Sequence, residues 1–149
     1  MVVVFDDFIG SGNKAIRRAN WLKRLANDKG VTEINFFYLS LAAMEFGLRN
    51  IYEQVGGPVF SSFPLKKGIT ERYSSAEADF YIKLMLNIES RLGKRYKRKK
   101  LDDYSMGYSS SETLYCAEND NCPNNVFPVF WWRVLRDGLT FRTILNRAG

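Results

Sequence analysis

The chain has 149 residues, of which 46% are hydrophobic and 26% charged; these values are typical of one globular domain and exclude wholesale disorder. It contains no histidine and only two cysteines, Cys116 and Cys122. Catalytic Ser-His-Asp and Cys-His arrangements and structural zinc tetrads are therefore excluded. So few cysteines predict free thiols in a reducing cytoplasm.

The net charge of +6 comes from one short segment. Lys94–Lys100 holds six of the 22 basic residues, and the other 16 balance the 16 acidic ones. A nucleic-acid-binding surface usually spreads its positive charge over a face or a helix. We interpret this segment as a solvated loop, with anion contact as the alternative.

No targeting or membrane segment is expected. The apolar start of the chain is followed at once by two acids, unlike a signal peptide, and the longest apolar run, Phe36–Met44, is too short to cross a bilayer. We predict a soluble, cytoplasmic protein without a membrane partner.

The first half of the chain alternates predicted strands and helices. Met1–Phe5 is a continuous β-branched run, typical of a strand buried on both faces of a parallel sheet. The pattern then predicts a turn over 6–13, a helix over 14–27, a strand over 33–39, a helix over 41–55 and a short strand at 59–60. This order predicts an α/β fold with a small parallel sheet and flanking helices.

The second half is expected to begin with a long helix. Ser74 and Glu77 fit a capping box, and an apolar stripe follows that we interpret as core packing: Phe80, Leu84, Ile88 and Leu92. Further along, we predict a loop over 102–112, a strand over 113–117 and a turn over 119–125.

An aromatic segment, Val126–Trp132, comes near the end of the chain. We interpret it as core or edge structure rather than a base-stacking platform. If it is a strand, Trp131 or Trp132 must face the surface. Asn124 and Asn125 are either turn residues or functional ones.

The most informative stretch is Val2–Lys14, which reads VVVFDDFIGSGNK. A strand delivers Asp6 and Asp7 to the carboxyl edge of the sheet, where α/β proteins bind ligands. Gly10, Ser11 and Gly12 then allow backbone amides to approach a ligand, and the following helix points its positive end at the same place. The side chains of Ser11, Asn13 and Lys14 add donors, although Lys14 could equally be a solvated residue at the start of a helix.

Acids beside an anion site predict a ligand with phosphate at one end and hydroxyls at the other. A ribose 5-phosphate is such a ligand, because its 2- and 3-hydroxyls can donate to Asp6 and Asp7. The alternative is a turn with solvated acids. A phosphatase with a nucleophilic aspartate would need two acids separated by one residue, and Phe8 occupies the second position.

Four apolar residues, two acids, two apolar residues and a small-residue turn resemble the PRPP-binding signature of type I phosphoribosyltransferases. The resemblance implies that Asp6 and Asp7 hold the ribose hydroxyls, with a catalytic role, and that Gly10–Lys14 hold the 5-phosphate. It departs from the family pattern at Phe8, at Gly10 and at Lys14, where a hydroxyl residue is common.

Further blocks extend the resemblance over most of the chain. Together with the turn, they look like a phosphoribosyltransferase-like subgroup associated with bacterial defence systems: Lys67–Tyr73, Met106–Tyr108 and Cys122–Trp132. In the family, a pyrophosphate loop and a catalytic loop precede the PRPP turn. We therefore expect residues 1–149 to be one such domain that lacks its amino-terminal part, unless a protein partner supplies that part or the site only binds.

The resemblance predicts binding of PRPP or a ribose-phosphate nucleotide, with phosphoribosyl transfer in the intact protein and Mg²⁺ held through substrate oxygens. Two alternatives remain open. One is a non-catalytic nucleotide sensor within a bacterial defence system. The other is a nucleic-acid-binding module that uses the basic segment 94–100.

Overall fold

The computed structural model describes residues 1–117 and 121–147, and the chain divides into two compact units, Met1–Leu65 and Lys66–Gly149. We call them unit 1 and unit 2. Unit 2 contains 15 of the 22 basic and 10 of the 16 acidic residues, so it carries +5 of the net charge. That the two units form one domain stays a prediction.

Unit 1 is built around a three-stranded parallel sheet in the order β1-β2-β3. Its elements alternate along the chain: β1 (Val2–Ile9), α1 (Asn13–Asn27), β2 (Phe36–Met44), α2 (Glu45–Val55) and β3 (Val59–Leu65). The α/β class and the small parallel sheet with flanking helices are thereby confirmed.

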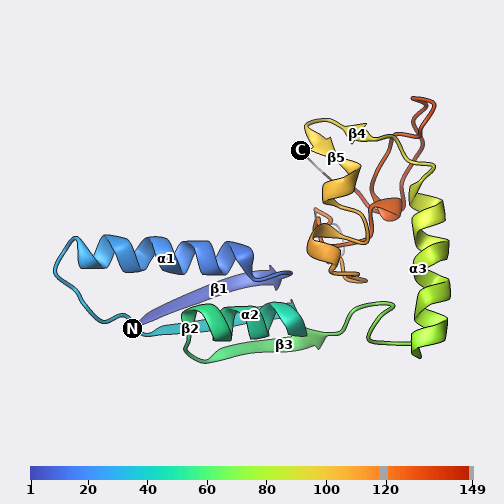
Figure 1. Cartoon of the computed structure of the whole chain (residues 1–149). Coiled ribbons are helices and arrows are strands. Elements are labelled where there is room, and N and C mark those ends of the chain that lie inside the picture. The colour runs from blue at the N-terminus through green and yellow to red at the C-terminus, as the bar shows by residue number, and fades with distance from the viewer. Residues whose placement is uncertain (118–120, 148–149) are drawn as a thin grey trace. The chain divides into compact units, whose positions relative to one another are not determined.

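Both helices of unit 1 cover the same face of the sheet (Figure 1). Crossovers between parallel strands are right-handed almost without exception, and these two advance in the same direction across the sheet, so both place their helix on one side. The core of unit 1 lies between this face and the helices. Its buried members are Ile9, Ala15, Ile16, Ala19, Phe36, Tyr38, Ala43 and Ile51.

The opposite face of the sheet is largely bare. Val3 and Phe5 are 52% and 72% exposed, and Phe60 is 58% exposed. The prediction that Met1–Phe5 is buried on both faces was therefore wrong. The physical reason is that both helices cover the other face of the sheet.

Several element boundaries also differ from prediction, and β3 extends from the predicted 59–60 to Leu65. β1 continues through Asp6 and Asp7 to Ile9, so the predicted turn over 6–13 shrinks to the three residues before α1. β2 begins at Phe36 and runs to Met44, through the first residues of the helix predicted over 41–55. Pairing with β1 decides this, because Ala42 and Ala43 lie opposite Phe8 and Ile9.

In unit 2, α3 (Ser75–Glu89) begins at the predicted capping box of Ser74 and Glu77. The predicted core stripe was wrong. Phe80, Leu84 and Ile88 are exposed, and Leu92 is buried beyond the end of the helix. The side of α3 that packs is a different one, made of Ala78, Ile82, Met85 and Glu89.

The basic segment folds into a hairpin rather than a simple loop. β4 (Arg95–Tyr96) pairs antiparallel with β5 (Lys99–Lys100). Short 3-10 turns follow at η1 (Leu101–Asp103), η2 (Tyr108–Ser110) and η3 (Pro128–Phe130). The strand predicted over 113–117 is reduced to one bridge, between Thr113 and Val126.

The aromatic segment forms the core of unit 2. Both Trp131 and Trp132 are fully buried, because the segment turns at η3 instead of forming a strand with alternating faces. Their indole NH groups donate to the carbonyls of Val126 and Gly93, each at 3.0 Å. The interpretation of this segment as core is confirmed.

The predicted turn over 119–125 lies partly outside the described residues, which leave out 118–120. Within it, Asn125 is buried, and its amide donates to the carbonyl of Tyr108 at 3.2 Å and to Ser111 Oγ at 3.3 Å. These bonds make Asn125 a structural turn residue. In the described ranges, none of the helices combines the length and apolarity needed to cross a bilayer.

Candidate functional site

The residues after β1 form a tight turn into α1. Gly12 is the N-cap of α1 and has φ of +81°, a left-handed conformation that favours glycine. The amide of Ile16 makes the first intrahelical bond, to the Gly12 carbonyl at 3.0 Å. The amides of Asn13, Lys14 and Ala15 therefore have no intrahelical acceptor and lie at the positive end of the helix, which suits an anion.

Helix α2 packs against this turn and holds it in place. A Cβ on Gly12 would lie only 2.7 Å from the carbonyl oxygen of Gly47, and the amide of Asn50 donates to the Ser11 carbonyl at 3.1 Å. The sequence did not lead us to expect a role for Gly47 or Asn50. Gly47 was the available signal, because a glycine inside a helix costs about 1 kcal/mol and usually marks a close packing contact.

The acids lie within β1, not in the turn as predicted. Lys14, in the first turn of α1, reaches back to Asp6: its Nζ is 3.1 Å from Asp6 Oδ2 and 3.3 Å from Oδ1. The Lys14 side chain is 56% exposed and that of Asp6 only 14%. Asp7 is exposed. The structure thus brings Asp6 and Lys14 together, which neither interpretation of Lys14 anticipated.

The two carboxyl groups differ in acidity. Burial and the neighbouring Asp7 carboxyl raise the pKa of Asp6, and the opposing effect of the Lys14 ammonium is smaller. The pKa of Asp7 is lowered, chiefly by its hydrogen bond with Asp6. The pair therefore offers one readily ionised acceptor and one that more readily keeps its proton.

One further polar group lies beside the acids. Ser40 on β2 is opposite Asp6 in the sheet and is buried, and its hydroxyl has no hydrogen-bond partner in the part of the chain that the structure describes. In the turn itself, Ser11 is buried while Asn13 and Lys14 are exposed. The site therefore combines amide donors, a cation and two acids within one strand, turn and helix.

Magnesium fits these residues only together with a ligand. Mg²⁺ is commonly held by one or two carboxylates plus substrate phosphate oxygens. The described residues contain no group of three or more acidic or cysteine side chains that could hold a metal ion. Asp7, exposed and with a lowered pKa, could supply one such carboxylate.

The fold and the turn define an α/β protein of the phosphoribosyltransferase-like class. A family model described as PRTase-CE matches residues 1–147, so the chain belongs to that family. Comparisons with curated proteins and with solved structures found no match. The phosphoribosyltransferase-like resemblance stated from the sequence is thereby confirmed, while the association with bacterial defence stays a prediction.

Proposed function

We propose that Gly10–Lys14 bind the 5-phosphate of PRPP or of a ribose-phosphate nucleotide, and that Asp6 and Asp7 accept hydrogen bonds from the ribose hydroxyls. One observation carries the proposal. The turn before α1 is held by α2 and presents backbone amides that have no intrahelical acceptor. These amides lie within one helical turn of the Lys14 ammonium, which contacts Asp6. The membership of the chain in a phosphoribosyltransferase-like family supports it.

Lys14 would link the two halves of the ligand. Its Nζ contacts Asp6, yet most of its side chain is exposed, so the ammonium can turn toward a phosphate in the turn. A bound phosphate would then share this cation with Asp6. Hydrogen bonds to charged groups are worth about 1.5–3 kcal/mol each, so two ribose hydroxyls on the acids would matter to affinity.

Phosphoribosyl transfer is the reaction that the family implies. An acceptor atom bonds to ribose C1 while the bond from C1 to the pyrophosphate oxygen breaks; pyrophosphate leaves with the electron pair, and the acceptor gives its proton to solvent. Asp6 or Asp7 would stabilise the positive charge that develops on the sugar. Magnesium, when bound, would neutralise charge on the pyrophosphate oxygens.

Titration calorimetry with the full chain tests the binding proposal. The ligands are PRPP, ribose 5-phosphate, ribose and inorganic phosphate, each with and without Mg²⁺. We expect ribose 5-phosphate to bind more tightly than either of its halves. The double variant Asp6→Asn, Asp7→Asn should lose the contribution of the sugar, at least ten-fold in affinity, while inorganic phosphate binds no more weakly than before.

Asp28→Asn is the matched control, because Asp28 is an exposed acid at the other end of α1. If the double variant binds every ligand like the parent, the proposal is wrong. Labelled PRPP incubated with candidate bases then separates the two roles of the site. Release of pyrophosphate indicates transfer, and binding without release indicates a sensor.

A further inference from the structure

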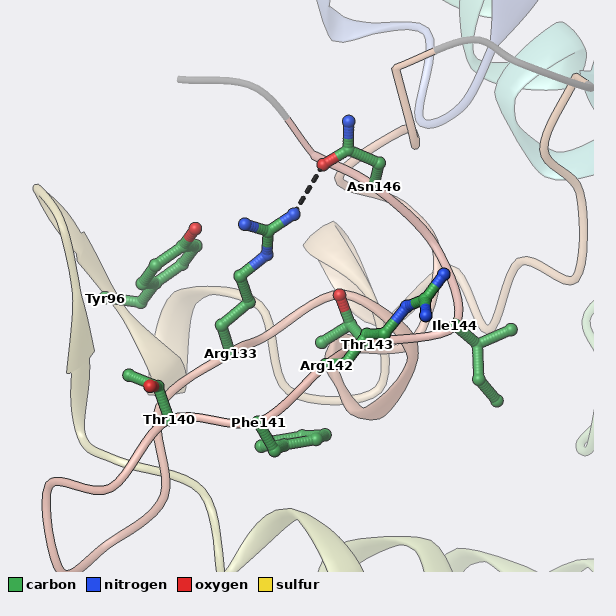
Figure 2. A pocket seen from close by; sticks show the side chains of 8 residues that line it. All are labelled: Tyr96, Arg133, Thr140, Phe141, Arg142, Thr143, Ile144 and Asn146. Atoms are coloured by element: carbon green, nitrogen blue, oxygen red, sulfur yellow. Dashed lines mark hydrogen bonds between the residues drawn. The ribbon is translucent and has the colours of Figure 1, made fainter.

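A cavity in unit 2 is lined by none of the residues of the proposed ribose-phosphate turn. Its volume is about 580 Å³, within the usual range of about 300–1,000 Å³ for ligand sites. Figure 2 shows the side chains around it. They are Tyr96, Arg133, Thr140, Phe141, Arg142, Thr143, Ile144 and Asn146.

The cavity is built on a hydrogen-bonded frame. The chain turns back at Gly138, where φ is +86°, and the amide of Phe141 donates to the Arg133 carbonyl at 3.0 Å. The amide of Gly93, just before the basic hairpin, donates to the Val134 carbonyl at 2.8 Å. Buried Trp132 ties this frame to the core through its bond to Gly93.

The lining combines cations with flat apolar surface. Arg133 is oriented by Asn146, whose Oδ1 accepts from its guanidinium at 2.6 Å, as the dashed line in Figure 2 marks. Arg142 is exposed and makes no hydrogen bond or ion pair within residues 1–117 and 121–147. Among the described lining residues none is acidic. Two arginines and the Thr140 hydroxyl suit phosphate oxygens, while the rings of Tyr96 and Phe141 suit a nucleobase.

The basic hairpin extends this surface. Tyr96, which lines the cavity, belongs to β4, and the turn that follows carries the exposed Lys97 and Arg98. Lys97 Nζ lies 5.5 Å from the centre of the Tyr96 ring. Positively charged side chains therefore extend from the cavity along the hairpin. The single phosphate group of a mononucleotide cannot contact all of them.

From these observations we infer that unit 2 binds single-stranded nucleic acid. One base stacks on Phe141 or Tyr96, Arg133 and Arg142 hold the adjoining phosphates, and the next phosphates follow the hairpin Lys94–Lys100. Stacking platforms combined with a cationic groove are the general means by which proteins hold single strands. The aromatic contact comes from Tyr96 and Phe141, because Trp131 and Trp132 are buried.

Fluorescence anisotropy with the full chain tests the inference. The probes are a labelled ten-nucleotide single strand, an abasic strand of equal charge, a ten-base-pair duplex and a mononucleotide. We expect the single strand to bind at least ten-fold more tightly than the mononucleotide and at least five-fold more tightly than the abasic strand. Equal binding of the abasic strand would mean a polyanion surface and overturn the inference, as would tighter binding of the duplex.

Three variants assign the contacts. Arg142→Ala should weaken single-strand binding at least five-fold and reduce the dependence of log K on log salt by about 0.7, the value of one phosphate contact on a single strand. Phe141→Leu keeps an apolar side chain without a ring, so it should weaken binding of the normal strand and leave the abasic strand unaffected. Arg72→Ala removes one exposed charge elsewhere in unit 2 and should change neither quantity.

The proposed ribose-phosphate site is tested separately. The double variant Asp6→Asn, Asp7→Asn should bind the single strand as the parent does, because both residues belong to unit 1. If Arg142→Ala and Arg72→Ala have equal effects, or if the parent binds no strand at 50 mM salt, the inference fails whatever the outcome for PRPP.

Discussion

Gly47 on α2 lies directly against the backbone of Gly10, and a Cβ at position 47 would overlap the Gly10 carbonyl oxygen. The proposed phosphate-binding turn is therefore shaped by a helix that follows it by more than thirty residues. Together with the bond from Asn50 to the Ser11 carbonyl, this contact holds the turn in place before any ligand binds.

The contact is tested by whether Gly47→Ala raises or lowers the free energy of unfolding. In an unconstrained helix the change would stabilise the protein by about 1 kcal/mol. Here we expect the free energy of unfolding to fall by about 1–3 kcal/mol, because the turn must move away from the added methyl group. Urea denaturation followed by circular dichroism measures it, with Glu53→Ala on the exposed side of α2 as the control. A stabilised Gly47→Ala protein would contradict the close approach.

The acid pair should titrate in two separate steps. Carboxyl NMR resonances should give Asp6 a pKa above 3.8 and Asp7 a pKa below 3.8. Because ionised Asp6 is disfavoured in the fold, its contribution to stability is lost as pH rises through its raised pKa. Asp6→Asn should therefore unfold at a higher temperature than the parent at pH 7, a gain that disappears below pH 3.8.

Lys14→Met tests whether the Lys14 ammonium lowers the pKa of Asp6. Without the ammonium, the pKa of Asp6 should rise further, since Lys14 is what lowers it. Asp28→Asn, which also removes one exposed charge, should leave both titrations unchanged. Equal midpoints for the two acids in the parent would be inconsistent with the arrangement described here.

Glu89 is a buried acid in unit 2. Two substitutions separate the effect of its charge on stability from the effect of its hydrogen bonds. Its carboxylate accepts from Ser105 Oγ at 2.6 Å and from the Met106 amide at 3.0 Å, while burial raises its pKa above 4.5. Stability is therefore lost as pH rises through this raised pKa. In Glu89→Gln the amide oxygen can still accept from the Met106 amide, while the NH2 group can donate to Ser105 Oγ, and no charge is buried; its melting temperature should therefore exceed that of the parent by more at pH 8 than at pH 4.5.

Glu89→Ala is the contrasting variant. It leaves the Ser105 hydroxyl and the Met106 amide without their acceptor, and we expect a loss of about 1–3 kcal/mol at every pH. Thermal melts of the three proteins at pH 4.5, 6 and 8 decide the matter. A gain in Glu89→Gln that does not depend on pH would mean that the carboxyl does not titrate in this range.

The two thiols should differ in reactivity. Cys122 is fully buried, and burial raises its pKa to about 12, so almost none of it is thiolate at pH 8. Cys116 is only half-buried. A chromogenic disulfide reagent should modify one thiol per native chain, and none in Cys116→Ser until urea is added. Rapid modification of the second thiol in the native protein would contradict the burial of Cys122.

The sequence predicted the parallel sheet and the glycine-containing connection from β1 to α1, although not the bounds of that turn, because their signals are local. A β-branched run, two glycines and an amphipathic segment each indicate an element without knowledge of its neighbours. The capping box at Ser74 worked for the same reason. The end of β2 could not be predicted in this way, because Leu41–Met44 suit a helix or a strand equally and the pairing of Ala42 with Phe8 decides between them.

The errors at the site have the same origin. The contact of Lys14 with Asp6 depends on β1 continuing past the acids, and the brace from Gly47 depends on where α2 docks. The side of α3 that packs could not be read from its apolar residues, since Phe80 is exposed while Glu89, satisfied by Ser105, is buried. Contacts between residues far apart in the sequence decided the positions of Gly47 and Glu89.

The bare face of the β1-β2-β3 sheet has a consequence during synthesis. All the residues of unit 1 precede unit 2 in the chain, so this sheet can form on the ribosome before unit 2 is complete. Phe5 and Phe60 would be exposed from that point on, beside two unpaired strand edges. A nascent chain of this kind is a natural client for chaperones that recognise exposed aromatic residues.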